Sequence, residues 1–393
     1  MKKNISILGS TGSIGLSTLS IIDKKKNKFN IILLTANRNF DLICKQIKKY
    51  EPDFYVINDK STFLKVKKKI ISKKTKVLNN FEFLNLKKKI DITVLAIPGI
   101  EGLQPTVQMI QLSKKVLIAN KEAIICGWHL IKKKSIESKT KLIPVDSEHY
   151  SIQKLLENHN LDEIDKIYLT ASGGPFLNFK KNQFKKIKIQ DALKHPKWKM
   201  GKKISIDSST LMNKILELIE AQKLFNIPSD KIEILIHPES LVHAIIKLKN
   251  GLTKFIYHET SMVIPLANAI FEEKLNISDF YKIKNFNDNK KIIKNLSFEK
   301  VNNTTFPVIK IIKKINEFPS TAIIINAANE VLVEQFLKKK IPFLAINKII
   351  LSFLKNRNYR KYAIRTSKNI DQIINIDSWA RHETLKIIKE KYE

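Results

Sequence analysis

The chain has 393 residues, of which 43% are hydrophobic, so it is long enough for two or three folded domains. Its net charge of +34 would suit nucleic acid or an anionic membrane, but only five of the 71 basic residues are arginines and the lysines are spread along the whole chain. We therefore expect no nucleic-acid partner and, since no stretch approaches roughly 20 continuous apolar residues, no membrane partner.

The first third of the chain alternates short apolar strands with helical patterns, which is typical of a parallel sheet covered by helices. This pattern predicts an α/β fold that begins with a Rossmann-like dinucleotide-binding domain over residues 1–145. The predicted strands are Ile5–Leu8, Ile31–Ala36, Phe54–Ile57, Thr93–Ile97, Val116–Ala119 and Leu142–Val145.

A glycine-rich turn, Gly9 to Gly15, follows the first strand and opens a helix that runs to about Ile22. Such a turn lets a pyrophosphate approach the backbone and lie at the helix N-terminus. The second strand ends in Asn37-Arg38-Asn39, where an NAD enzyme usually has an acidic residue for the ribose hydroxyls. Because Arg38 can instead pair with a 2′-phosphate, we expect NADPH as the cofactor.

Carboxylates follow the last strand of this series. Asp146 and Glu148 are two residues apart, and in an extended backbone that spacing directs both side chains to one side. Oxygen ligands of this kind suit Mg²⁺ or Mn²⁺. Lys121, just after another strand, lies where it could reach an anionic ligand.

Residues 146–272 mix strands with longer connections and predict a central α+β catalytic domain. Ser172 opens a Gly-Gly-Pro turn that can present a hydroxyl to an anion. The segment from His195 to Gly201, within a flap near 195–203, has a glycine hinge, a histidine and Trp198 to cover a ligand.

A helix is predicted over Thr210–Phe225, with residues 207–210 at its start as a natural phosphate site. Asn213 and Glu217 lie one turn apart on one face, with Lys214 beside them. Glu217 is the expected third metal ligand.

Residues 273–303 are rich in Asn and Lys and predict a linker, and residues 304–393 predict a C-terminal helical domain. The two cysteines, Cys44 and Cys126, are too few for a disulfide framework, so we expect a cytoplasmic protein.

Together these segments resemble the 1-deoxy-D-xylulose 5-phosphate reductoisomerase family of the non-mevalonate isoprenoid pathway. The resemblance is carried by ILGSTGSIG at 7–15, ANKEA at 119–123, PVDSEH at 144–149, TASGGPF at 170–176, HPKWKMGKKISIDSSTLMNK at 195–214 and NAANE at 326–330.

The resemblance implies a metal-assisted rearrangement of 1-deoxy-D-xylulose 5-phosphate, followed by reduction with NADPH to 2-C-methyl-D-erythritol 4-phosphate, in a homodimer. It implies metal ligation by Asp146, Glu148 and Glu217, and phosphate binding by Ser172, Ser208, Asn213 and Lys214. Substrate or metal-site contacts would come from Lys121, Ser147 and His195, and closure over the substrate from Trp198 and Met200. Cofactor contacts would come from Thr11, Gly12, Ser13, Ile14, Asn37, Arg38, Asn39, Asn120, Glu122 and Gly201.

Four positions depart from the family pattern, namely Asn37, Lys199, Ile215 and Thr260. They leave the three proposed metal ligands intact. The alternative function is another metal-dependent, NADP-linked dehydrogenase acting on a small phosphorylated substrate.

Overall fold

The computed structural model describes residues 2–70, 74–81, 88–180, 182–198, 200–282 and 295–392. The chain divides into two compact units. The first comprises residues 1–123, 129–150 and 261–292, and the second comprises residues 124–128, 151–260 and 293–393. The domain boundaries expected from the sequence, at 145/146, 272/273 and 303/304, remain predictions.

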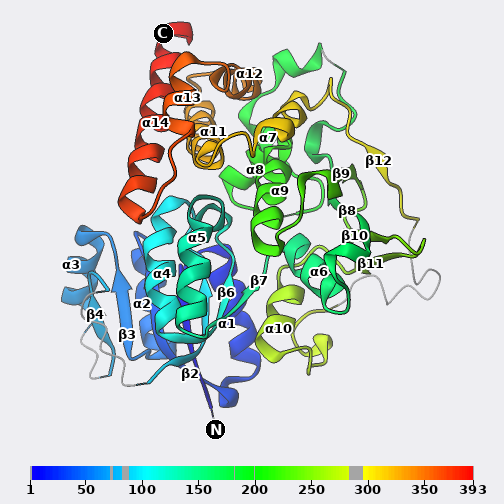
Figure 1. Ribbon diagram of the computed structural model, residues 1–393. Helices are drawn as coiled ribbons and strands as arrows, with labels where there is room; N and C mark the ends of the chain where they lie inside the picture. The colour runs from blue at the N-terminus through cyan, green and yellow to red at the C-terminus, as the bar shows by residue number, and fades with distance from the viewer. Residues whose placement is uncertain are drawn as a thin grey trace. The chain divides into compact units, whose positions relative to one another are not determined.

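The first unit is built on a seven-stranded parallel sheet in the order β4-β3-β2-β1-β5-β6-β7 (Figure 1). Its strands are β1 Lys3–Leu8, β2 Phe29–Ala36, β3 Phe54–Ile57, β4 Lys76–Leu78, β5 Ile90–Leu95, β6 Ser113–Ile118 and β7 Lys141–Pro144. The direction of strand order reverses between β1 and β5, which is where doubly wound sheets bind ligands. This arrangement confirms the predicted Rossmann-like fold.

Apolar side chains fill both faces of the parallel sheet, as expected when helices cover both sides. Ile5, Leu34, Val94 and Leu117 are fully buried. The helices are α1 Ser13–Lys24, α2 Phe40–Tyr50, α3 Lys60–Lys69, α4 Leu103–Gln111, α5 Lys121–Glu137, α6 Ser147–Leu156 and α10 Val263–Phe271. Residues 124–128 of α5 and residues 151–156 of α6 belong to the second unit. Helix α10 returns late in the chain to contact α1 and contributes Leu266 and Ile270 to the same core.

The second unit contains a five-stranded mixed sheet in the order β11-β10-β8-β9-β12. The strands are β8 Ile164–Ala171, β9 Ile232–Ile236, β10 Val242–Leu248, β11 Thr253–Tyr257 and β12 Glu299–Lys300. Strands β8 and β9 are parallel, and the other pairs are antiparallel. Part of the predicted linker, residues 283–294, lies outside the described residues.

The helices of the second unit include a C-terminal group, which confirms the predicted helical region. They are α7 Ile189–Leu193, α8 Lys202–Ser209, α9 Met212–Phe225, α11 Thr321–Leu337, α12 Phe343–Phe353, α13 Arg357–Ala363 and α14 Ile370–Tyr392. Helix α11 is almost entirely buried and contacts α8, α12 and α14. It therefore forms the centre of this helical group.

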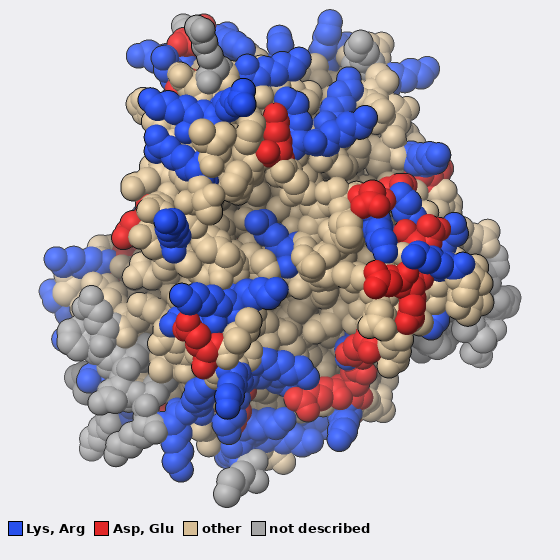
Figure 2. Space-filling model, viewed as in Figure 1, with Lys and Arg blue, Asp and Glu red and all other residues tan. Residues whose placement is uncertain are grey.

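The basic residues stand on many separate parts of the face shown in Figure 2, with uncharged surface between them. Among the described residues, no helix is both long enough and apolar enough to span a membrane.

Candidate active site

The glycine-rich turn lies between β1 and α1. Gly9 has a φ of +82°, and a Cβ there would lie 2.5 Å from the carbonyl oxygen of Ala96, so only glycine fits. Gly12 occupies the N-cap of α1, and the residues around it are exposed or half-buried. The exposed N-terminus of α1 is thus suited to an anion. The predicted cofactor residues here are Thr11, Gly12, Ser13 and Ile14.

A buried polar network holds this turn in place. The Ser10 hydroxyl lies 2.7 Å from Gln46 Oε1 and 3.1 Å from the Tyr55 hydroxyl, and Gln46 Nε2 donates to the Ser10 carbonyl at 2.9 Å. Gly9 N–H donates to the Thr35 hydroxyl at 3.0 Å. Burial raises the pKa of the Tyr55 phenol. Sequence reasoning missed Gln46, although an amide on the apolar face of α2 was an available signal.

Arg38 follows β2 on an exposed turn between Asn37 and Asn39. Its side chain is 82% exposed, and its Nε lies 3.5 Å from Asp59 Oδ1. Asn39 caps α2 by accepting a hydrogen bond from Leu42 N–H. The guanidinium is therefore accessible to a phosphate, with Asp59 as the competing partner.

Asn120, Lys121 and Glu122 begin α5 directly after β6. Asn120 caps the helix by accepting from Ala123 N–H at 2.9 Å, and its amide donates to the Gly99 carbonyl at 3.0 Å. Lys121 Nζ lies 3.1 Å from Asp146 Oδ2, and its side chain is only 10% exposed. A cation is thus fixed beside the first predicted metal ligand, and the structure joins two predicted site residues that the sequence separates by 25 positions.

Asp146 precedes α6, whose first turn carries Ser147, Glu148 and His149. The two carboxylates have oxygen atoms within 4.8 Å of each other. The sequence-based reason for their proximity was wrong, because Glu148 lies in a helix and not in an extended strand. Ser147 donates to Glu148 at 2.6 Å.

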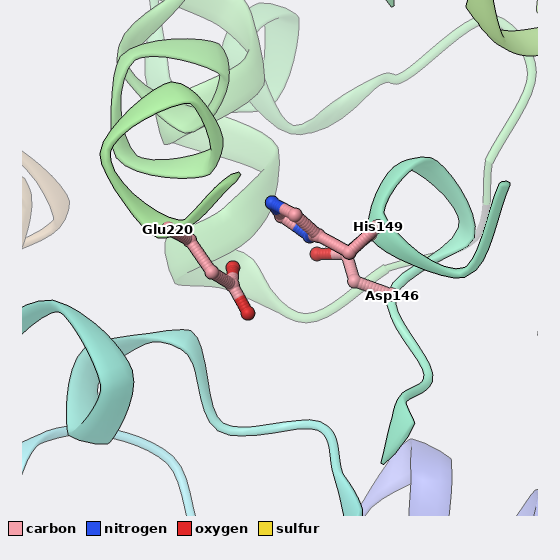
Figure 3. A group of neighbouring side chains, drawn as sticks. All are labelled: Asp146, His149 and Glu220. Carbon is pink, nitrogen blue, oxygen red and sulfur yellow. The ribbon is translucent and has the colours of Figure 1, made fainter. Parts of the chain in front are cut away.

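His149 is a residue of this site that sequence reasoning did not weigh. It is fully buried, and one of its ring nitrogens also lies within 4.8 Å of an Asp146 oxygen. Figure 3 shows Asp146 and His149 extending from the same turn at the start of α6, and labels Glu220 on α9. The hard oxygen donors of Asp146 and Glu148 fit Mg²⁺ or Mn²⁺.

In the second unit, Ser172 follows β8 and meets the flap. Its hydroxyl lies 3.0 Å from His195 Nε2 and accepts from Gly174 N–H at 3.1 Å. His195 Nδ1 accepts from the N–H groups of Lys197 and Trp198. The imidazole proton must therefore be on Nε2, which donates to Ser172. Burial, with a smaller effect of Lys214, lowers the pKa of His195 to about 4, so the ring is neutral at pH 7.

The predicted helix start near Ser208 was wrong. Residues 202–209 form α8, so Asp207 and Ser208 lie at the end of a helix, and α9 begins only at Met212. Leu211, with a φ of +63°, separates the two helices. The sequence hides this break because leucine rarely adopts a left-handed conformation. The helix-start argument for a phosphate at residues 207–210 therefore fails.

Helix α9 nevertheless presents the predicted polar cluster. Lys214 Nζ lies 2.5 Å from Glu217 Oε2, and Asn213 donates to the other oxygen. Glu217 is 2% exposed. A Cβ on Gly174 would lie 2.9 Å from the Ser208 carbonyl oxygen. The Ser172 turn therefore packs against Ser208, in the same unit as the cluster of Asn213, Lys214 and Glu217.

The flap carries an aromatic contact that the sequence did not indicate. The Trp198 ring lies 6.0 Å from His243 of β10, and His243 stacks at 3.9 Å on His258. His258 precedes Thr260, one of the departures from the family pattern. Gly201 caps α8, and a Cβ there would meet nothing within 4 Å. Lys199 lies outside the described residues.

Three family models match the chain. They are 1-deoxy-D-xylulose 5-phosphate reductoisomerase over residues 5–127, its C-terminal domain over residues 142–225, and DXP reductoisomerase C-terminal domain over residues 259–383. A protein of Pelagibacter ubique named 1-deoxy-D-xylulose 5-phosphate reductoisomerase is 44% identical over 382 residues, which are 96% of this chain and 97% of that protein.

Solved structures agree with these matches. The Zymomonas mobilis reductoisomerase in complex with NADPH has a TM-score of 0.86 and 31% identity, with 99% of each chain covered. A DOX-P reductoisomerase in complex with NADPH, fosmidomycin and magnesium has a TM-score of 0.90 and 28% identity over 100% of both chains. The protein therefore belongs to the 1-deoxy-D-xylulose 5-phosphate reductoisomerase family.

Proposed function

We propose that this enzyme converts 1-deoxy-D-xylulose 5-phosphate into 2-C-methyl-D-erythritol 4-phosphate by skeletal rearrangement and reduction, using NADPH and Mg²⁺ or Mn²⁺. The observation that carries this proposal is the succession of three family matches, which extend well beyond the nucleotide-binding segment. A different NADP-linked dehydrogenase that shares only that segment is for this reason not favoured.

The proposed metal ligands are Asp146 and Glu148 of the first unit and Glu217 of the second. The carboxylates supply the hard oxygen donors that Mg²⁺ and Mn²⁺ prefer, and Lys121 stabilises the Asp146 charge at 3.1 Å. A divalent ion held there supplies Lewis-acid polarisation of the hydroxyketone. Ser147, through its hydrogen bond to Glu148, orients that carboxylate.

The substrate phosphate is assigned to Ser172, Ser208, Asn213 and Lys214. Because His195 Nε2 and Gly174 N–H both donate to the Ser172 oxygen, the Ser172 proton is left to point toward a ligand. Lys214 adds a positive charge. Binding the phosphate away from the reacting carbons provides energy for orienting them. Trp198 and Met200 would then exclude water from the substrate.

NADPH supplies the hydride for the reduction. Its pyrophosphate is assigned to the turn containing Thr11, Gly12, Ser13 and Ile14, and its 2′-phosphate to Arg38 beside Asn37 and Asn39. Asn120, Glu122 and Gly201 complete the proposed set of cofactor contacts. For Asn120, the capping bond to Ala123 N–H and the bonds to the 97–99 loop favour an indirect role, in which it shapes that loop.

The test of the function is an assay of NADPH oxidation by the purified protein. We expect oxidation only when 1-deoxy-D-xylulose 5-phosphate and Mg²⁺ or Mn²⁺ are both present. Thorough chelation should reduce turnover to background, and returning the ion should restore it. Undiminished turnover after chelation would contradict the metal requirement, and no turnover with the complete mixture would contradict the function itself.

A pair of His195 variants tests the role of its two ring nitrogens. His195→Asn keeps an acceptor near the Nδ1 position but loses the hydrogen bond to Ser172. His195→Gln keeps a donor near the Nε2 position but loses the acceptor for the N–H groups of Lys197 and Trp198. We expect the first to raise the substrate KM about tenfold, since one such hydrogen bond is worth about 1–1.5 kcal/mol. His195→Gln should mainly lower kcat, because the flap loses the hydrogen bonds that its backbone makes to Nδ1. Identical kinetic constants for the two variants would refute this division of roles.

We also place the enzyme in the cytoplasm as a homodimer. Both cysteines are free and buried, which suits a reducing compartment. Strand β11 is the outer strand of its sheet among the described residues. Phe255 on this strand is 46% exposed, and Leu252 just before it is 58% exposed. An exposed apolar edge of this kind favours pairing with a second copy. Light scattering should give twice the chain mass of 45.4 kDa.

A further inference from the structure

The NAANE segment at residues 326–330 lies in α11, and the proposed function gives it no role. It carries two asparagines, Asn326 and Asn329, that are both 0% exposed. Burial of an amide is costly unless its polar atoms are paired, so each needs a physical reason. The Oδ1 atom of Asn329 has no hydrogen-bond partner within the described part of the chain. Within the described part of the chain, the side-chain hydrogen bond of Asn329 is made by its Nδ2 group.

That group makes one specific bond. Asn329 Nδ2 donates to Asp207 Oδ1 at 2.7 Å, and the other carboxylate oxygen lies 3.2 Å from Lys203 Nζ. The Asp207 side chain is 2% exposed. The ion pair between Lys203 and Asp207 joins two residues one turn apart on α8, so this pair does not connect Asp207 to another element. Asn329 supplies that external tie, from a helix that is itself almost fully buried.

Asp207 lies close to the junction between α8 and α9. It is followed by Ser208, by the end of α8 and by the left-handed Leu211, after which α9 begins. The Asp207 carbonyl accepts from the Thr210 hydroxyl at 3.2 Å. A shift of Asp207 would therefore be transmitted to Ser208 and to the first turn of α9, which carries Lys214.

We infer that Asn329 is a positioning residue, which holds Asp207 and through it sets the α8–α9 junction that presents Ser208 and Lys214 to the substrate phosphate. This inference rests on the proposed function for its kinetic consequence, but the geometry of the junction can be measured independently.

The test uses the full-length enzyme and a reciprocal exchange. Asn329→Asp places two buried carboxylates against each other and should raise the substrate KM at least tenfold, with NADPH affinity unchanged. The double variant Asp207→Asn with Asn329→Asp reverses donor and acceptor and should return KM to within about threefold of the wild type. Lowering the pH should also restore the single variant in part, because a shared proton replaces the lost bond.

Asn326→Ala is the matched control. It changes a buried asparagine of the same helix whose amide donates to Glu330 at 3.3 Å and to the Cys126 sulfur at 3.9 Å. We expect its KM to stay within twofold of the wild type. If Asn329→Asp fails to fold, Asn329→Ser removes the bond without adding charge and should raise KM in the same direction.

Amide hydrogen exchange over residues 205–214 separates this inference from the function. The Asn329 variants should exchange faster there, and Asn326→Ala should not. Exchange that is unchanged, or a double variant that recovers nothing, would overturn the positioning role even in an active enzyme. A wild-type protein without substrate-dependent NADPH oxidation would instead overturn the proposed function and leave the exchange result standing.

Discussion

Glu217→Gln is expected to lower kcat by a factor on the order of 10³ while the enzyme still binds NADPH. The substitution keeps the shape of the side chain and removes the charge that a divalent ion needs, and metal stabilisation of charge at a carbonyl is worth several kcal/mol. Glu217 is not one of the proposed cofactor contacts, and the glycine-rich turn lies in the first unit, so the affinity of the enzyme for NADPH should not change. Turnover against metal concentration, together with NADPH titration by fluorescence, measures both effects.

The loss of charge at residue 217 also removes the buried ion pair between residue 217 and Lys214 Nζ, which lies 2.5 Å from Glu217 Oε2. Removing one member of a buried pair is destabilising, so part of the effect could come from a distorted helix. Glu220→Gln is the comparison, because Glu220 lies on the same helix and is also 2% exposed. We expect Glu220→Gln to keep kcat within tenfold and to leave the metal dependence unaltered. If Glu220→Gln lowered kcat more than Glu217→Gln, the metal ligand on α9 would be Glu220, one turn further along the helix, and not Glu217.

Six of the seven strands of the first unit could be predicted because a parallel sheet buries both faces and so requires continuous apolar segments. The three-residue edge strand β4, Lys76–Leu78, was not predicted. Segments such as Ile31–Ala36 and Val116–Ala119 are almost entirely apolar. The observed β2 contains the first segment, and β6 overlaps the second. The glycine-rich turn could also be predicted from the sequence, since Gly9 has a conformation that other residues rarely adopt.

The α8–α9 break could not be predicted in the same way. No glycine or proline marks it, and Leu211 takes a left-handed conformation that its own side chain disfavours. Met212 and Ile215, which follow the break, are fully buried, so the residues beside it belong to the tertiary core. The return of α10 to the first sheet is invisible for a related reason, because contacts between residues far apart in the chain leave no local pattern.

Side-chain partnerships were the least predictable part of the site. The sequence identified Asp146 and Lys121 separately, but only the fold places them 3.1 Å apart. Likewise, the role of Ser172 depends on the His195 tautomer, and that tautomer depends on two backbone N–H groups of the flap. Residue types suggested the chemistry, and the geometry decides which atom donates to which.

Arg38→Ala is expected to weaken NADPH binding about ten- to thirtyfold and to change NADH binding less than twofold. Only NADPH carries the 2′-phosphate, and a charge-assisted pair with a phosphate at an exposed site is worth about 1.5–2 kcal/mol after solvent screening. Because the Arg38 side chain is 82% exposed, the effect should shrink as salt rises. Titrating both dinucleotides against both proteins at two ionic strengths measures this difference.

Asp59 provides the control for this assignment. It lies 3.5 Å from Arg38 and also caps α3 by accepting from Thr62 N–H, a bond that keeps its pKa well below the usual range. Asp59→Asn can still cap the helix but no longer competes for the guanidinium, so NADPH should bind as tightly as in the wild type or up to about twofold more tightly. Arg38→Lys keeps the charge without the planar fork and should fall between wild type and Arg38→Ala. If Arg38→Ala weakened both dinucleotides equally, Arg38 would be supporting the turn after β2 and not reading the phosphate that distinguishes them.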